Sequence, residues 1–325
     1  MGWLALTIHR YSTYTLLGIP FVFLVGLLLV LGQKANPLIR SKVLFIGVAL
    51  PWTALAVIHG VFPALGIEWR PDPQGWGSLF LAWACSGGYW SSRIILPFLP
   101  LIVVMASRWI WRPIWLAYNY RKRWSNYHGP EREKAEEVIS LATEALGVPS
   151  PEVVIVPNTA PVAFVTGWRR PLVVFSCGLV RNLSPHELLH VAAHEVAHIR
   201  QGDDLLTRLM GFLRDMAFYS PLVFPVFQAW KMERDMAADD LAVTVTGDYL
   251  GYAATLLKVW RLGQPKNFHL PLPAGTNFLW PARGIVARAE RLLGEALARD
   301  GDGRWWRLLP LTILLTGMAL VSLAC

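Results

Sequence analysis

One five-residue pattern in the sequence is typical of metal-dependent hydrolysis: His194–Glu195–Val196–Ala197–His198. Histidines four residues apart on a helix lie on one face, one turn above the other, so both imidazoles can reach a single Zn²⁺ ion. Glu195 beside the first histidine can act as general base on the attacking water and later pass the proton to a leaving amine. The pattern therefore predicts one zinc ion per chain, with His194 and His198 as metal ligands and Glu195 as the catalytic residue.

A second copy of the same pattern precedes the first, at His186–Glu187–Leu188–Leu189–His190. This copy begins in the first helical turn, where Glu187 is already explained by a capping box with Ser184. We therefore favour the later copy as the zinc site. We interpret His186 and His190 as polar or partly buried histidines of the helix surface, with a weak accessory metal site as the alternative.

A third metal ligand is expected from the acidic run at residues 231–240, because catalytic zinc usually keeps three protein ligands and one water. Asp235 and Asp239 lie four residues apart on a predicted helix. One of them, Asp235, can bind zinc while Asp239 orients a ligand histidine. Glu233 lies about 200° around that helix from Asp235, so the two cannot both face the metal, and Glu233 is the alternative third ligand.

The elements around the motif follow from capping and turn residues. Ser184 followed by proline predicts a helix start, and that helix should end at Gly202. Upstream, apolar spacing predicts a helix over 131–146 that stops at Gly147, followed by short strands near 153–156, 163–165 and 172–175. If the segment Val162–Ala163–Phe164–Val165 is an exposed edge strand, we expect it to bind substrate by strand addition.

The composition points to a membrane. Hydrophobic residues make up 54% of the 325 residues and charged residues only 16%, whereas soluble domains are roughly a quarter charged. The same figures argue against disorder. The three cysteines form no close pair, which argues against a disulfide scaffold and a cysteine metal site.

We predict an integral membrane α-helical protein with about four transmembrane helices and a cytoplasmic α+β zinc-metallopeptidase domain. Residues 1–118 form the predicted membrane domain, residues 119–303 the catalytic domain and residues 304–325 the last span. The first three spans are expected at 12–33, 43–66 and 94–116. The apolar segment 209–230 contains charges and prolines, so we interpret it as membrane-associated rather than crossing; a buried apolar hairpin is the competing interpretation.

The net charge of +8 is explained by topology rather than by nucleic acid. Lys34, Arg40 and Lys42 follow the first predicted span without an acidic residue, and four basic residues at and after the end of the third, Arg112, Arg121, Lys122 and Arg123, precede the first acidic one. Basic loops stay in the cytoplasm. We therefore expect an external N-terminus, a cytoplasmic catalytic domain and no direct nucleic-acid partner.

Several motifs together resemble one known family, the BlaR/MecR-type integral-membrane zinc metallopeptidases, which carry a gluzincin-like HExxH site. The motifs are Val162–Ala163–Phe164, Gly167–Trp168–Arg169–Arg170–Pro171, Leu183–Ser184–Pro185–His186–Glu187–Leu188, His194–Glu195–Val196–Ala197–His198–Ile199–Arg200–Gln201–Gly202–Asp203, Ser220–Pro221–Leu222–Val223 and Arg234–Asp235–Met236–Ala237–Ala238–Asp239–Asp240. Weaker similarity lies at Tyr252–Lys258 and Arg283–Leu293. The resemblance covers about residues 10–325, is specific around 160–240, and implies a bacterial inner-membrane protein with its zinc domain between spans three and four.

The sequence departs from the family in two respects. The family's third ligand is a glutamate four residues before an aspartate, and here that register places Asp235 before Asp239. Antibiotic sensors of the family carry a large extracellular domain after the fourth span, whereas this sequence ends at Cys325, so we expect no such sensor domain.

The resemblance implies an endopeptidase that cleaves a cytosolic repressor or a membrane-associated regulator in signalling, with the lipid bilayer as its environment. A homo-oligomer stays open. One alternative is a membrane quality-control or processing protease of the HtpX/prenyl-protease type. The other is a non-catalytic membrane scaffold with a degenerate zinc site, which Asp235 in place of glutamate suggests.

Overall fold

The computed structural model describes residues 36–56, 64–66, 78–125, 127, 129–167, 169–217, 223–263 and 282–297. The chain divides into two units, which are described separately. One comprises Met1–Ser107, Met210–Glu233 and Asp302–Cys325, and the other Arg108–Leu209 and Arg234–Gly301. The second unit carries the predicted zinc motif.

The described helices and strands follow one another in a fixed order along the chain. They are α2 (Pro37–Ala56), α4 (Ser78–Trp124), α5 (Pro130–Leu146), β1 (Glu152–Val156), β2 (Ala163–Thr166), β3 (Leu172–Ser176), α6 (Cys177–Asn182), α7 (Pro185–Gln201), α8 (Asp203–Met216), α9 (Val223–Thr246), α10 (Tyr249–Leu262) and α11 (Ala282–Leu297).

The sheet is small and mixed, with strand order β1-β3-β2. Strand β1 pairs with β3 in parallel, and β2 pairs with β3 antiparallel. The turn between β2 and β3 contains Gly167 at a φ of 98°. A Cβ atom there would lie 2.5 Å from the Arg170 carbonyl oxygen, so the turn requires glycine. The predicted pair of strands around a glycine-containing turn is thereby confirmed.

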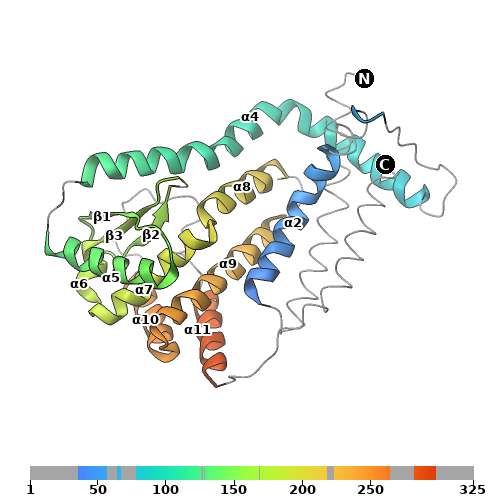
Figure 1. Ribbon diagram of the computed structural model, residues 1–325. Helices are drawn as coiled ribbons and strands as arrows, with labels where there is room; N and C mark the ends of the chain where they lie inside the picture. The colour runs from blue at the N-terminus through green and yellow to red at the C-terminus, as the bar shows by residue number, and fades with distance from the viewer. Residues whose placement is uncertain are drawn as a thin grey trace. The chain divides into compact units, whose positions relative to one another are not determined.

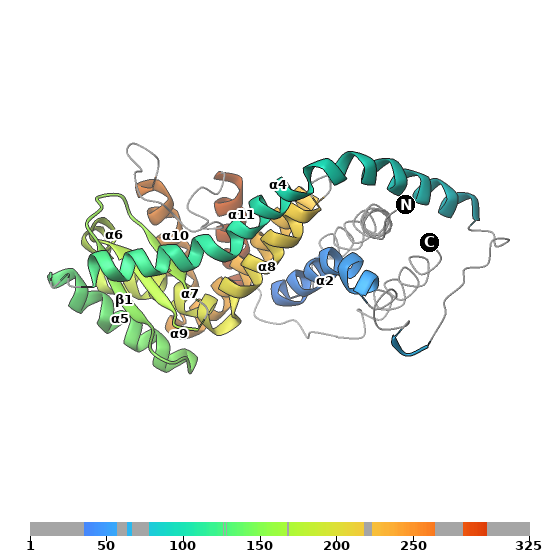
Figure 2. The ribbon, with the colours of Figure 1, turned by 90° about the horizontal axis from the view of Figure 1, so that it is seen from above.

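Helices cover both faces of the sheet (Figure 1). Alternate strand residues such as Val154 and Val174 pack with Leu116 and Tyr120 from the C-terminal part of α4. The residues between them, such as Ile155, face the core formed with α5 and α7. The view from above shows α4 running across the strands (Figure 2). A helical domain around a small mixed sheet confirms the predicted α+β class.

The predicted ends of the motif helix are confirmed. The Glu187 amide donates to Ser184 Oγ at 3.3 Å, and the Ser184 amide donates to Glu187 Oε2 at 2.8 Å, which completes the capping box. The helix α7 ends at Gly202, whose φ of 67° is left-handed. Helix α5 likewise ends at Gly147, with a φ of 63°.

The predicted spans are only partly covered by the described residues. Spans 12–33 and 304–325 lie outside them, span 43–66 falls partly on α2, and span 94–116 falls within α4. Among the residues that the structure describes, no helix combines the length and the apolar character needed to cross a membrane. The spans, their orientation and the domain boundaries therefore stay predictions.

The segment 209–230 is divided between the end of α8 and the start of α9, while residues 218–222 lie outside the described part. Several of its apolar side chains are buried, among them Met210, Phe227 and Trp230. Phe224 is exposed. Association of this segment with a membrane stays a prediction.

Candidate metal centre

Three of the predicted site residues converge in the second unit. Nitrogen or oxygen atoms of His194, His198 and Asp235 all lie within 4.8 Å of one another. The Nε2 atoms of the two histidines are 3.1 Å apart, and His198 Nε2 lies 3.8 Å from Asp235 Oδ1. The capped helix α7 supplies both histidines, and α9 supplies the aspartate.

This arrangement fits a zinc ion. Two nitrogen ligands on a tetrahedral zinc, each at its usual bond length, lie roughly 3.3 Å apart, close to the separation of the two Nε2 atoms. In each ring Nδ1 already contacts a carboxylate, so Nε2 is the atom presented inward. Carboxylates behind metal-binding histidines fix the tautomer and the ring orientation in this way.

Behind His194 lies a buried network centred on Asp239. Nδ1 of His194 lies 3.1 Å from Asp239 Oδ1 and 3.0 Å from the Tyr252 hydroxyl, which donates to Asp239 Oδ1 at 2.7 Å. Arg288 from α11 donates to both oxygens of Asp239, at 2.8 and 2.6 Å. Asp239 therefore contacts the ring of His194, and its role in orienting a metal ligand stays a prediction.

The ion pair determines the charge of Asp239. Burial on its own would raise the pKa of this carboxyl, but the Arg288 guanidinium lowers the pKa well below its ordinary value. Asp239 is therefore ionised at neutral pH. Arg288 Nη1 also lies 3.8 Å from Asp235 Oδ2, so one buried cation lies beside two carboxylates of the site.

Behind His198 lies a second carboxylate, Asp203, whose Oδ2 is 2.6 Å from His198 Nδ1. Arg234 Nε donates to the other oxygen of Asp203 at 2.5 Å. Burial lowers the pKa of His198, but the hydrogen bond and the charge of Asp203 outweigh it and raise the pKa to about 9. Metal binding at this imidazole therefore releases a proton at neutral pH.

Glu195 is a buried carboxyl beside the two histidines, only 8% exposed. Burial raises its pKa, while His194 and His198 act in the opposite direction. A carboxyl with a raised pKa accepts a proton more readily near neutral pH, as a general base requires.

The alternative third ligand, Glu233, has a different partner. Its Oε2 atom lies 2.9 Å from Nε of Arg40 in α2. Among the described residues, the carboxylate that converges with the two histidines is that of Asp235. Metal ligation by either residue stays a prediction, and the helical register that favours Asp235 matches the geometry.

Residues Val162–Val165 fall on β2 and the residue before it, and β2 lies at one end of the strand order. Both backbone polar groups of Val162 are occupied. Its amide donates to Ser176 Oγ and its carbonyl accepts from the Ser176 amide, each at 2.9 Å. Within the described part of the chain, β3 is the strand that pairs with β2. Substrate binding by this edge stays a prediction.

Sequence reasoning missed Asp203, Arg234, Tyr252 and Arg288. Asp203 follows directly on the glycine that ends α7, and this position after a helix end could have indicated a contact with the last turn. Tyr252 and Arg288 lie in the regions of weaker family similarity, and that similarity was the one signal for them. Their contacts join positions 58 and 49 residues apart in sequence.

Of the two histidines nearer the helix start, His190 differs from its interpretation as a polar or partly buried histidine of the helix surface. His190 is 1% exposed and therefore does not lie on the helix surface. Helix α10 packs against α7, where Thr255 contacts the His190 ring. His186 is exposed, as interpreted.

Comparison with known proteins places this geometry in a family. Residues 91–277 match the family described as BlaR1 peptidase M56. The chain is 31% identical over 141 residues to Protease HtpX of Chromohalobacter salexigens, covering 40% of this chain and 46% of that protein. It is 39% identical over 93 residues to a Protease HtpX homolog of Persephonella marina, covering 26% of this chain and 32% of the relative. It is 28% identical over 131 residues to Protease HtpX of a Psychrobacter species, covering 38% of this chain and 43% of that protein.

The matched part spans less than half of the length of each of these curated relatives. The family match, by contrast, extends over more than half of the chain and contains His194, Glu195, His198, Asp235 and Asp239. The resemblance seen in the motifs is thereby confirmed: the chain belongs to the BlaR1 peptidase M56 family and is related to the HtpX metalloproteases.

Proposed function

We propose that this protein is a membrane-embedded, zinc-dependent endopeptidase that hydrolyses peptide bonds of a cytosolic or membrane-associated protein. The observation that carries the proposal is the convergence of His194, His198 and Asp235 beside the buried Glu195. Membership in a peptidase family supports the reaction class.

The chain's own residues divide the work of the reaction. His194, His198 and Asp235 would hold the ion, and Zn²⁺, when bound, supplies the Lewis acidity that polarises the scissile carbonyl and activates water. The Glu195 carboxylate takes a proton from the attacking water and delivers it to the nitrogen of the leaving amine. Asp239 and Asp203 accept hydrogen bonds at Nδ1 of the two histidines and so hold both rings in position.

Substrate binding is proposed at the sheet edge next to this centre. Helix α7, which carries Glu195, packs against β2. A peptide added to β2 as a further strand would be held by main-chain hydrogen bonds. Its scissile bond would then lie near the helix that carries the general base.

The biological role is proposed as regulatory proteolysis at the bacterial inner membrane, with the catalytic domain in the cytoplasm. The basic loops and the apolar composition support this location. Similarity to proteins named Protease HtpX favours a second candidate role, quality control or processing of membrane proteins. Cleavage of many unfolded membrane proteins would favour the second role, and cleavage of one regulator the first.

Substitution of the general base tests the proposal. Glu195→Gln in the detergent-purified full chain should keep zinc and lose about 10²–10⁴-fold in peptide cleavage, because the proton acceptor is lost while the ligands stay. Zinc content and the rate of cleavage of fluorescent unfolded casein are the measurements. Glu187→Gln is the matched control, since it lies in the other copy of the pattern and glutamine preserves the capping box.

The ligand assignment is tested in the same preparation. Asp235→Asn should lose the zinc ion held by His194 and His198, whereas Glu233→Gln should retain it. A parent protein without zinc would support the non-catalytic scaffold. Cleavage that survives Glu195→Gln unchanged would overturn the assigned role of Glu195.

A further inference from the structure

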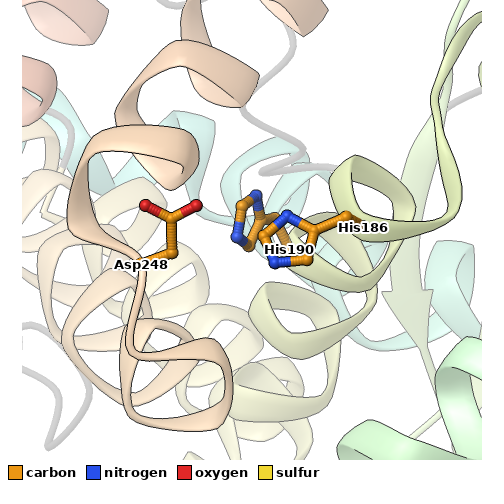
Figure 3. Close-up of side chains that lie close together, drawn as sticks. All are labelled: His186, His190 and Asp248. Carbon is orange, nitrogen blue, oxygen red and sulfur yellow. The ribbon is translucent and has the colours of Figure 1, made fainter.

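A second group of metal-binding side chains lies toward the start of α7. His186, His190 and Asp248 come together there, with one ligand atom of each within 4.8 Å of the others (Figure 3). The two imidazole rings are 4.5 Å apart between centroids. Asp248 comes from the residue before α10, so the group joins two helices.

The buried His190 has an unused nitrogen in this group. The Thr255 hydroxyl donates to the Gly251 carbonyl at 2.8 Å, so its oxygen must accept the bond from His190 Nδ1, which is 3.0 Å away. The ring is then protonated on Nδ1 and carries its lone pair on Nε2. His190 Nε2 is buried and has no hydrogen-bond partner among the described residues. A buried acceptor without a partner is unfavourable unless something binds it.

The third member of the group is a carboxylate that also has a structural role. Asp248 caps α10 through Oδ1, which accepts from the Gly251 amide at 2.8 Å. The cap uses Oδ1, and within the described part of the chain Oδ2 remains for a ligand.

The nearby glutamate is engaged elsewhere. Glu187 accepts from the Ser184 amide and from the Lys258 ammonium, the latter at 2.8 and 2.7 Å. Its carboxylate is therefore neutralised and held at the helix start. A metal in this group would lack the free general base that Glu195 supplies in the other copy of the pattern.

We propose that His186, His190 and Asp248 form a second metal site, which binds a divalent transition-metal ion of the zinc class. This site does not catalyse hydrolysis; the bound ion joins α7 to α10. Two imidazoles and one carboxylate are a common donor set for such ions, and the exposed side of His186 leaves room for water as a further ligand.

This site would act on the catalytic centre through α10. The same helix carries Tyr252, whose hydroxyl donates to Asp239 and contacts His194. The Tyr252 ring lies 5.5 Å from that of His190 between centroids. A metal that joins the first turn of α10 to α7 therefore holds Tyr252 at its place behind the catalytic ligand.

Zinc stoichiometry in four versions of the full chain tests this proposal. They are the parent, a second-site double variant (His186→Ala with Asp248→Asn), a catalytic-site double variant (His194→Ala with His198→Ala) and the combination of all four changes. Asparagine keeps the cap of α10, and the buried His190 is left unchanged so that the fold is preserved. Circular dichroism confirms that each version is folded.

The expected zinc contents are two, one, one and none per chain after equilibration with zinc. Cobalt substituted into the catalytic-site double variant should give visible absorption bands that the combined variant lacks. The second site would be overturned if the parent held one zinc that persisted in the second-site double variant and disappeared in the catalytic-site double variant. That result would leave the proposed function intact. The reverse pattern would support the second site and overturn the catalytic one.

Discussion

At the residue scale, His194 and His198, the two proposed metal ligands, share the same kind of support. Each has a carboxylate behind Nδ1, and each carboxylate is held by an arginine, Arg288 for Asp239 and Arg234 for Asp203. All four supporting residues are buried. The imidazoles are therefore set in orientation before any metal arrives, which lowers the cost of ordering them on binding.

Removing the charge of Asp203 should weaken zinc binding without removing a ligand. Asp203→Asn keeps the shape of the side chain but leaves His198 without its anionic partner and Arg234 without its counter-ion. We expect zinc affinity to fall about 10–100-fold, measured by competition with a chelator. Asp204→Asn is the control, because Asp204 pairs with Arg208; an equal fall in both variants would contradict the role given to Asp203.

The sequence allowed the residues within one helix to be predicted, but not those that meet from different helices. His194, Glu195 and His198 could be proposed as site residues because helical spacing places them on one side of the helix. Asp239 followed from the same rule applied to α9. Arg288 and Tyr252 could not, since their contacts depend on how α10 and α11 pack, and this packing also buries His190.

At the element scale, specific residues determine where α7 begins and where it ends. The capping box at Ser184 satisfies amides of the first turn, and the left-handed Gly202 ends the helix directly before Asp203. These ends were predictable because the residue types that form them are specific. The layers around the sheet were not, since short apolar strands do not reveal which helix covers which face.

Gly202→Ala should destabilise the fold by about 1–2 kcal/mol, because a Cβ atom is strained at a left-handed φ. The free energy of unfolding from chemical denaturation is the measurement. Gly294→Ala in the exposed part of α11 is the control with the opposite sign, since no atom lies within 4 Å of the added Cβ and alanine favours a helix by about 0.5–1 kcal/mol. Equal effects at both positions would argue against strain at Gly202.

At the scale of the whole molecule, an acid-sensitive contact links segments that are distant in sequence. Glu131 at the start of α5 accepts from the Tyr127 hydroxyl and from Arg181 of α6, each at 2.7 Å. The hydrogen bond from Tyr127, followed by that from Arg181, lowers the pKa of Glu131 from 4.5 to about 2. The folded state therefore holds this carboxylate ionised at a pH where the unfolded chain binds a proton.

The stability from Glu131 should be fully present above about pH 5 and be lost as the pH falls towards 2. Glu131→Gln should lower the thermal midpoint at pH 7 and flatten its decline between pH 5 and 2. Glu133→Gln, an exposed position in the same helical turn, should leave that decline as in the parent. Parallel curves for the parent and Glu131→Gln would show that another group controls acid stability.

The pairing of Asp239 with Arg288 also bears on the order in which the chain is synthesised. Translation proceeds at roughly 5–20 residues per second, so the zinc motif leaves the ribosome well before α11 does. Until then Asp239 has no guanidinium beside it, and an unpaired carboxylate is too costly to bury. A nascent chain that already contains both copies of the histidine pattern therefore cannot yet form the complete site. The site can form only after the last described helix has left the ribosome.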